Sequence, residues 1–114
     1  MTIKKTIYCV AKADLSGYAY TSYGRVQFDS KAPRRSGMFN DLADAPKVLA
    51  RFYKLLNKSV IDDTEYSLAC KANPFPANQT PERQASYDRA IAEYNARATT
   101  EFTVVQVTVE EITR

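Results

Sequence analysis

Histidine is absent from the sequence of 114 residues, and with it the side chain that most often serves as general base or metal ligand. The two cysteines, Cys9 and Cys70, are far apart in the chain and do not complete a standard zinc site without histidine. A nucleophilic cysteine also needs a neighbouring base, and the sequence offers none. We therefore expect no metal site and no catalytic residue. Both cysteines are expected to be small buried side chains, with a disulfide or a reactive thiol as the alternative.

Glycine is also scarce, with three in the chain, and none stands in a spacing that cradles phosphate groups. Adjacent acidic residues are explained by strand, turn and helix-cap positions, so no carboxylate pair indicates acid–base chemistry. We expect a protein that is not an enzyme and that uses no cofactor.

Long apolar runs are missing as well. No stretch approaches the roughly eighteen consecutive apolar residues that a membrane-spanning helix needs. The N-terminal segment has only a short, alternating apolar run, which is unlike a signal peptide. We therefore expect a cytoplasmic protein with no membrane partner.

The composition that remains is typical of a globular domain. Apolar residues make up 45% and charged residues 25% of the chain, and its length predicts a single domain over residues 1–114. Alternating or β-branched residues predict five strands, at residues 3–13, 18–21, 25–29, 63–72 and 101–113. Apolar residues at helical spacing predict two helices, at residues 45–57 and 81–100.

These elements predict an α+β fold. We expect a mainly antiparallel sheet of four to five strands, in the order β–β–β–α–β–α–β, with the second and third strands as a hairpin or as one continuous strand. Two helices accompany it, and the first packs on one face of the sheet. Asp44 is a candidate cap for the first helix and Asn57 a candidate stop, while Thr80 followed by Pro81 favours the start of the second.

The stretch "GYAYTSYGRVQF" at residues 17–28 is dense in aromatic side chains. We expect a turn at 22–24, with Gly24 in the left-handed region and Tyr23 exposed at its tip. The other large residues are expected to face the core: Tyr18, Tyr20, Val26 and Phe28.

Seven cations are candidate partner-binding residues. Four recur along the first predicted helix within about 60° of arc, at about 100° per residue. Three more stand in the loop before it. The alternative is a solvated helix face without a function. The seven residues are Lys31, Arg34, Arg35, Lys47, Arg51, Lys54 and Lys58.

Tyrosines add to this prediction because they are enriched at interfaces. Tyr23 is therefore included in the predicted partner-binding surface, and edge-of-core packing is the alternative for most of the others. Charge is also uneven. Residues 1–58 hold eleven Lys/Arg against four Asp/Glu, or +7, and residues 59–114 hold five against nine, or −4. This asymmetry, with the thin apolar stripe of the second helix, is compatible with a homodimer.

The run "GYAYTSYGRVQF", a basic loop and then "MFNDLADAPKVLARF" resembles the layout of small accessory proteins of bacteriophages. Phe39 and the Asp44–Ala45 pair match the aromatic residue and the helix start of that layout. The resemblance covers residues 3–56 and has no counterpart in 60–114. It implies a protein that acts by binding, in the cytoplasm of a host cell, and it brings no catalytic residues.

Two functions follow as hypotheses. The first is a small binding module, such as a phage-type inhibitor or modulator, that contacts a host protein with an acidic surface through the cations and Tyr23. The second is a nucleic-acid-binding protein that neutralises phosphates with the same cations and reads no sequence.

Overall fold

The structure, a computed structural model, describes residues 2–112. The chain forms two compact units, one of residues 1–55 and 101–114 and the other of residues 56–100. Helix α1, Ala45–Ala72, runs unbroken from the first unit into the second. The single domain expected from the length stays a prediction.

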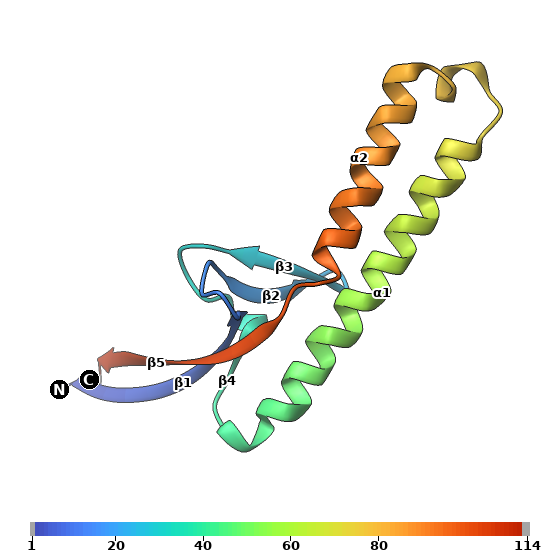
Figure 1. Ribbon diagram of the computed structural model, residues 1–114. Coiled ribbons are helices and arrows are strands. Elements are labelled where there is room, and N and C mark those ends of the chain that lie inside the picture. The colour runs from blue at the N-terminus through green and yellow to red at the C-terminus, as the bar shows by residue number, and fades with distance from the viewer. Residues whose placement is uncertain (1, 113–114) are drawn as a thin grey trace. The chain divides into compact units, whose positions relative to one another are not determined.

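The first unit contains an antiparallel sheet (Figure 1). β3 pairs with β2, and β2 and β4 both pair with one edge of β1, at Ala11 and at Tyr8–Cys9. β5 pairs with the opposite edge of β1 along its whole length. The position of Thr113, the predicted last residue of the final strand, lies outside the described residues. The strands are β1 Thr2–Lys12, β2 Tyr18–Ser22, β3 Arg25–Asp29, β4 Met38–Phe39 and β5 Phe102–Ile112.

The α+β fold class is therefore confirmed, and within residues 2–112 the two α-helices are α1 and α2, Pro81–Arg97. The same range holds three short 3-10 turns: η1 Arg35–Gly37, η2 Leu42–Asp44 and η3 Pro76–Asn78. Thr80 caps α2 as predicted, because its side chain accepts a hydrogen bond from the backbone N–H of Arg83. At the start of α1, the candidate cap Asp44 is the last residue of η2, and Asp41 caps that turn, where its side chain accepts a hydrogen bond from the N–H of Ala43.

The predicted strand at residues 63–72 is wrong, and so is the helix stop at Asn57. This segment is the second half of α1, and the element order lacks that strand. Polar and apolar residues alternate in this segment, as in a strand, but the segment also continues the buried side of a helix. Leu56, Val60 and Ser67 are buried at helical spacing. Pro46 lies in the first turn of α1, where it is tolerated, and no glycine or proline follows it until Pro74, which disfavours helical backbone at Asn73.

In the first unit, the start of α1 packs on one face of the sheet, which we call the helix face. Phe52 is 1% exposed and meets the ring of Phe102 edge-on, with centroids 5.8 Å apart. The neighbouring Tyr53 hydroxyl accepts a 2.9 Å hydrogen bond from the backbone N–H of Phe102. Phe28 stacks on Phe102 at 6.3 Å. The predicted packing of the first helix on one face is thus confirmed.

The hairpin register corrects the predicted orientation of its aromatic residues. Ala19 pairs with Phe28, and directly opposed residues share a face of the sheet. Phe28 therefore lies on the helix face, whereas Tyr18 and Tyr20 alternate onto the other face. The cause is the two-residue turn at Tyr23 and Gly24, which are both left-handed, with φ of 54° and 73°. The turn and the exposure of Tyr23 are as predicted.

In the second unit, side-chain amides complete the end of α1. The carbonyl of Lys71 accepts hydrogen bonds from Gln79 and Gln84, and that of Cys70 accepts one from Asn78. These bonds satisfy carbonyls that the last helical turn leaves without a partner. Lys71 also forms a 2.6 Å ion pair with Asp88 of α2. The connection between the two helices is therefore well anchored.

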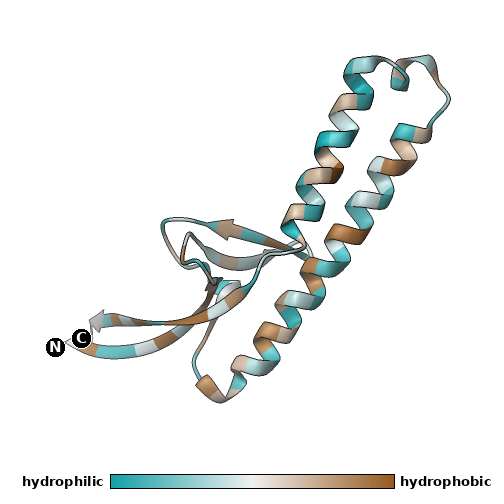
Figure 2. Cartoon of the chain, viewed as in Figure 1, coloured by the Kyte–Doolittle hydropathy of each residue, from teal (hydrophilic) through white to brown (hydrophobic). Residues whose placement is uncertain are grey.

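Hydrophobic and hydrophilic residues are interspersed along both helices (Figure 2). Among the residues that the structure describes, no helix combines the length and the apolar character needed to cross a membrane.

Candidate protein-binding surface

The sheet face opposite the helix face, which we call the open face, carries an apolar floor. The register of β1 with β5 sets Ile7 opposite Val107 and Cys9 opposite Val105. Because side chains alternate along a strand, Val109 and Ala11 lie on this face as well. The valines are only half-buried, in contrast to the fully buried Cys9. This floor is therefore partly accessible to another molecule.

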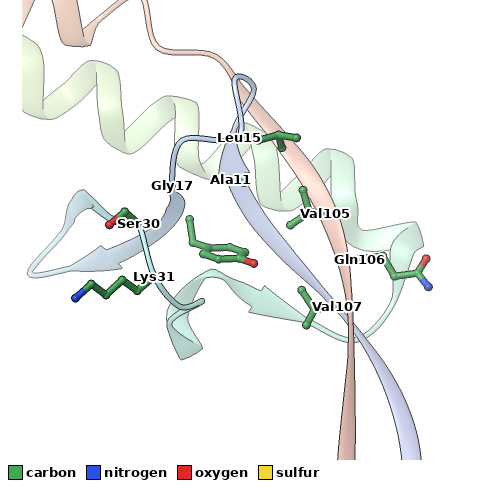
Figure 3. Close-up of a pocket in the computed structure, with 9 residues that line it drawn as sticks. Ala11, Leu15, Gly17, Ser30, Lys31, Val105, Gln106 and Val107 are labelled. Carbon is green, nitrogen blue, oxygen red and sulfur yellow. The ribbon is translucent and has the colours of Figure 1, made fainter.

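Two hollows lie over the open face, with volumes of about 370 and 350 Å³. Val105 and Val107 point into the first hollow, whereas Gln106 points away from it (Figure 3). Val109 and Ile7 line the second. The lining of the first hollow is completed by Ala11, Leu15, Gly17, Tyr18, Ser30 and Lys31, and that of the second by Lys5, Arg35, Met38, Phe39 and Asn40.

The loop after β3 brings cations to both hollows, and Asp29 holds its first turn. The Asp29 carboxylate accepts hydrogen bonds from the backbone N–H of Lys31 and Ala32 and from the side chain of Arg34. The Lys31 amide bond and then the Arg34 contact lower the pKa of Asp29 below its ordinary value. The anchor is therefore complete at neutral pH and weakens as the pH falls through the lowered pKa.

Further along the loop, the backbone fits closely against β2. The Ser36 hydroxyl donates to the carbonyl of Thr21 at 2.8 Å and accepts from its N–H at 2.9 Å. At Gly37 a Cβ atom would overlap the carbonyl oxygen of Ala19. Glycine thus permits the approach that leads into β4 and places Arg35 at the second hollow.

The charge around the two hollows is positive. Lys31 borders the first and Arg35 the second, and both side chains are exposed. Neither forms an ion pair with any residue in the described range 2–112. The described residues that line the hollows include no Asp or Glu. An apolar floor with this rim is complementary to an acidic segment that carries apolar side chains.

The other predicted cations lie elsewhere. Arg34 is occupied within the fold: its side chain forms a 2.8 Å ion pair with Asp29 and lies over the ring of Tyr20, 5.4 Å from the centroid. Lys47, Arg51 and Lys54 are exposed on the part of α1 that belongs to the first unit. That helix packs on the helix face, whereas Lys31 and Arg35 border the open face. The seven cations therefore do not form one continuous ridge.

Lys58, the fourth cation of the predicted ridge, lies in the second unit and has acidic neighbours on α1. Asp62 follows it at i+4, and Glu65 falls on the same arc at i+7. Residues at these spacings are neighbours on a helix surface, so the positive potential is weakened at this end. The continuous basic segment of α1 is thus Lys47, Arg51 and Lys54.

Leu15 is a residue of the open face that sequence reasoning did not select. It is 68% exposed, lines the first hollow and has a φ of 61°. A left-handed backbone costs a residue other than glycine about 1–2 kcal/mol. Tyr23 combines the same strain with full exposure at the hairpin tip. Strained and exposed apolar residues of this kind are typical of contact sites. The only sequence signal at Leu15 was its place in the turn before Gly17.

The cysteines do not contribute a reactive site to the open face. Burial raises the pKa of the Cys9 thiol, which keeps it protonated at neutral pH. Cys70 belongs to the second unit, and both thiols are free. Within residues 2–112, no three of the side chains suited to metal binding cluster together.

No family model, curated protein or solved structure matches the chain. The resemblance to small bacteriophage proteins stays a prediction, as does the expected cytoplasmic location.

Proposed function

We propose that this protein is a small binding module that holds an acidic segment of another protein on its open face. Apolar side chains of the segment enter the two hollows, while its carboxylates meet Lys31 and Arg35. The observation that carries this proposal is the positive rim around an accessible valine floor. Such contact serves to inhibit or modulate the bound host protein, in line with the function predicted from the sequence.

The free energies of apolar burial and of ion pairing indicate different roles for the valine floor and the rim cations. An exposed ion pair contributes about 0.2–1 kcal/mol. Apolar burial contributes about 25 cal/mol per Å². A segment that inserts two or three large side chains therefore gains most of its affinity from the floor. The cations select acidic segments over basic ones and accelerate association.

A charge-reversal experiment tests the site. The probe is a short fluorescent peptide in which glutamate and leucine alternate, and its affinity is measured by anisotropy. We expect Lys31→Glu/Arg35→Glu to weaken binding about tenfold, or about 1.4 kcal/mol, because two attractions become repulsions. The matched control, Lys47→Glu/Arg51→Glu, reverses two cations of α1 and is expected to leave the affinity unchanged. Equal loss in both variants, or no binding to the wild type, contradicts the proposal.

The strained residue Leu15 gives a second prediction. We expect Leu15→Asn to increase the free energy of unfolding by about 1 kcal/mol, because asparagine tolerates a left-handed backbone. The same change removes an apolar side chain from the first hollow and is therefore expected to lower the affinity for the glutamate–leucine peptide. Urea unfolding and peptide anisotropy measure the two effects. A gain in stability without a loss of affinity removes Leu15 from the site.

Tyr23→Asn is the matched variant at the other strained turn. The same stabilisation is expected, and its peptide affinity tests the predicted contact role of Tyr23. An unchanged affinity excludes Tyr23 from the peptide contact.

Nucleic-acid binding is a second candidate, favoured by one observation. Lys47, Arg51 and Lys54 are exposed along one arc of α1, and none pairs with an acid in the described part of the chain. A mixed-sequence oligonucleotide measured at low and physiological salt distinguishes this function, because phosphate contacts weaken steeply with salt. Absence of a mobility shift at low salt excludes it.

A further inference from the structure

The outer edge of β5 is a second surface of the sheet that is suited to binding, because it is an unpaired strand edge. Its register with β1 is unbroken from Thr2–Ile112 to Lys12–Phe102, and no other strand within residues 2–112 pairs with β5. Natural proteins protect such an edge with proline, lysine, a bulge or a short strand. Residues 103–109 contain no proline and no charge. This edge lacks those protections.

The hydrogen bonds identify the backbone groups that face outward. The carbonyl of Glu101 accepts from the N–H of Ala13, in register with the β1–β5 ladder. Because bonded positions alternate in an antiparallel ladder, odd-numbered residues of β5 bond to β1. The N–H and C=O groups of even-numbered residues point to the outer edge. Phe102 agrees with this pattern, since its N–H donates to Tyr53 rather than to β1.

The far part of the ladder also lacks a third strand. On the other edge of β1, β4 pairs only with Tyr8 and Cys9, so the described strand residues 2–6 and 108–112 form a two-stranded ribbon (Figure 1). A two-stranded ribbon is marginally stable in water, and a further strand stabilises it.

We propose that β5 pairs antiparallel with β5 of a second copy of this chain. Antiparallel pairing of identical strands gives a two-fold axis, which is the commonest symmetry of homodimers. One register sets Val107 opposite its own copy and Val105 opposite Val109 of the second copy. All three open-face valines of each strand then meet valines. The nearest registers that still pair the outward groups slide one strand by two residues, and in either direction they leave one valine of each strand without a valine partner.

This register has two consequences. Gln106 and Thr108 of the two copies form bonded pairs through their outward backbone groups, so the edge is satisfied. The valine floor continues across the two-fold axis and joins two open faces into one surface. Self-pairing does not depend on the peptide contact proposed above.

Disulfide trapping tests both the pairing and its register. Directly opposed residues that are not hydrogen-bonded have Cα atoms about 4.5 Å apart, within the range of about 4.4–6.8 Å that a disulfide bridges. We use the full chain with Cys9→Ala and Cys70→Ala, because Cys9 lies opposite Val105 and could form a disulfide within the chain, and we add a mild oxidant. Val107→Cys is expected to give a covalent dimer on a non-reducing gel. Val105→Cys and Val109→Cys are each expected to stay monomeric alone and to cross-link when mixed.

Light scattering provides the independent measurement. The wild type is expected at twice the 12.8 kDa chain mass. Gln106→Pro removes an outward N–H and is expected to give a folded monomer, with circular dichroism as the check on folding. A wild-type monomer without Val107→Cys cross-linking overturns the proposal. Cross-linking of Val105→Cys alone as readily as Val107→Cys overturns the register. A dimer that persists in Gln106→Pro places the interface elsewhere.

Discussion

Phe52→Ala is expected to lower the free energy of unfolding by about 3–5 kcal/mol. The side chain is 1% exposed and packs edge-on against Phe102, which also contacts Phe28 and Tyr53. Its removal leaves a cavity between α1 and the helix face that the surrounding rings do not fill. Since small domains are stable by about 5–15 kcal/mol, this one change removes a large part of the total.

Urea unfolding followed by far-ultraviolet circular dichroism measures the loss. Arg51→Ala is the matched control, because it truncates an exposed neighbour on α1 and alanine favours helix. We expect the control to change stability by less than about 0.5 kcal/mol. A loss below about 1 kcal/mol for Phe52→Ala contradicts the packing described for the helix face.

Gly37→Ala is expected to have the second largest effect, about 2–3 kcal/mol, because a Cβ atom at this position overlaps the carbonyl oxygen of Ala19. The loop must move away from β2 to relieve the overlap. We expect this movement to break the Ser36–Thr21 bonds and to displace Arg35 from the second hollow. Weaker binding of the glutamate–leucine peptide should therefore accompany the loss of stability.

Gly17→Ala is the control, because its Cβ atom would lie 3.4 Å from the carbonyl oxygen of Asp29, an ordinary contact. Urea unfolding of both variants gives the comparison, and the control is expected near the wild type. If Gly37→Ala is as stable as Gly17→Ala, the close approach of the loop to β2 is wrong.

Local chemistry predicted much of the fold. Alternation identified β1, β2, β3 and β5, and the Thr80–Pro81 pair identified the start of α2. The length of α1 was underestimated because residues 63–72 satisfy both a strand and a helix period. The helix is formed because it buries one side of α1. Tertiary packing of this kind routinely overrides the local preference of a segment for strand.

The candidate site was harder to predict, because it depends on which face each residue takes. Lys31 and Arg35 were selected from the sequence by charge alone. Their separation from Lys47 and Arg51 follows from the sheet that lies between loop and helix. Leu15 was not selected, since its significance lies in a backbone angle that sequence does not reveal.

Methyl NMR of the glutamate–leucine peptide complex tests the open face most directly. With isotope-labelled valine, we expect the largest chemical-shift changes at Val105, Val107 and Val109. Val48, which lies on α1, is expected to show little change. Shifts confined to α1, or none at the three β5 valines, would contradict an acidic segment bound on the open face.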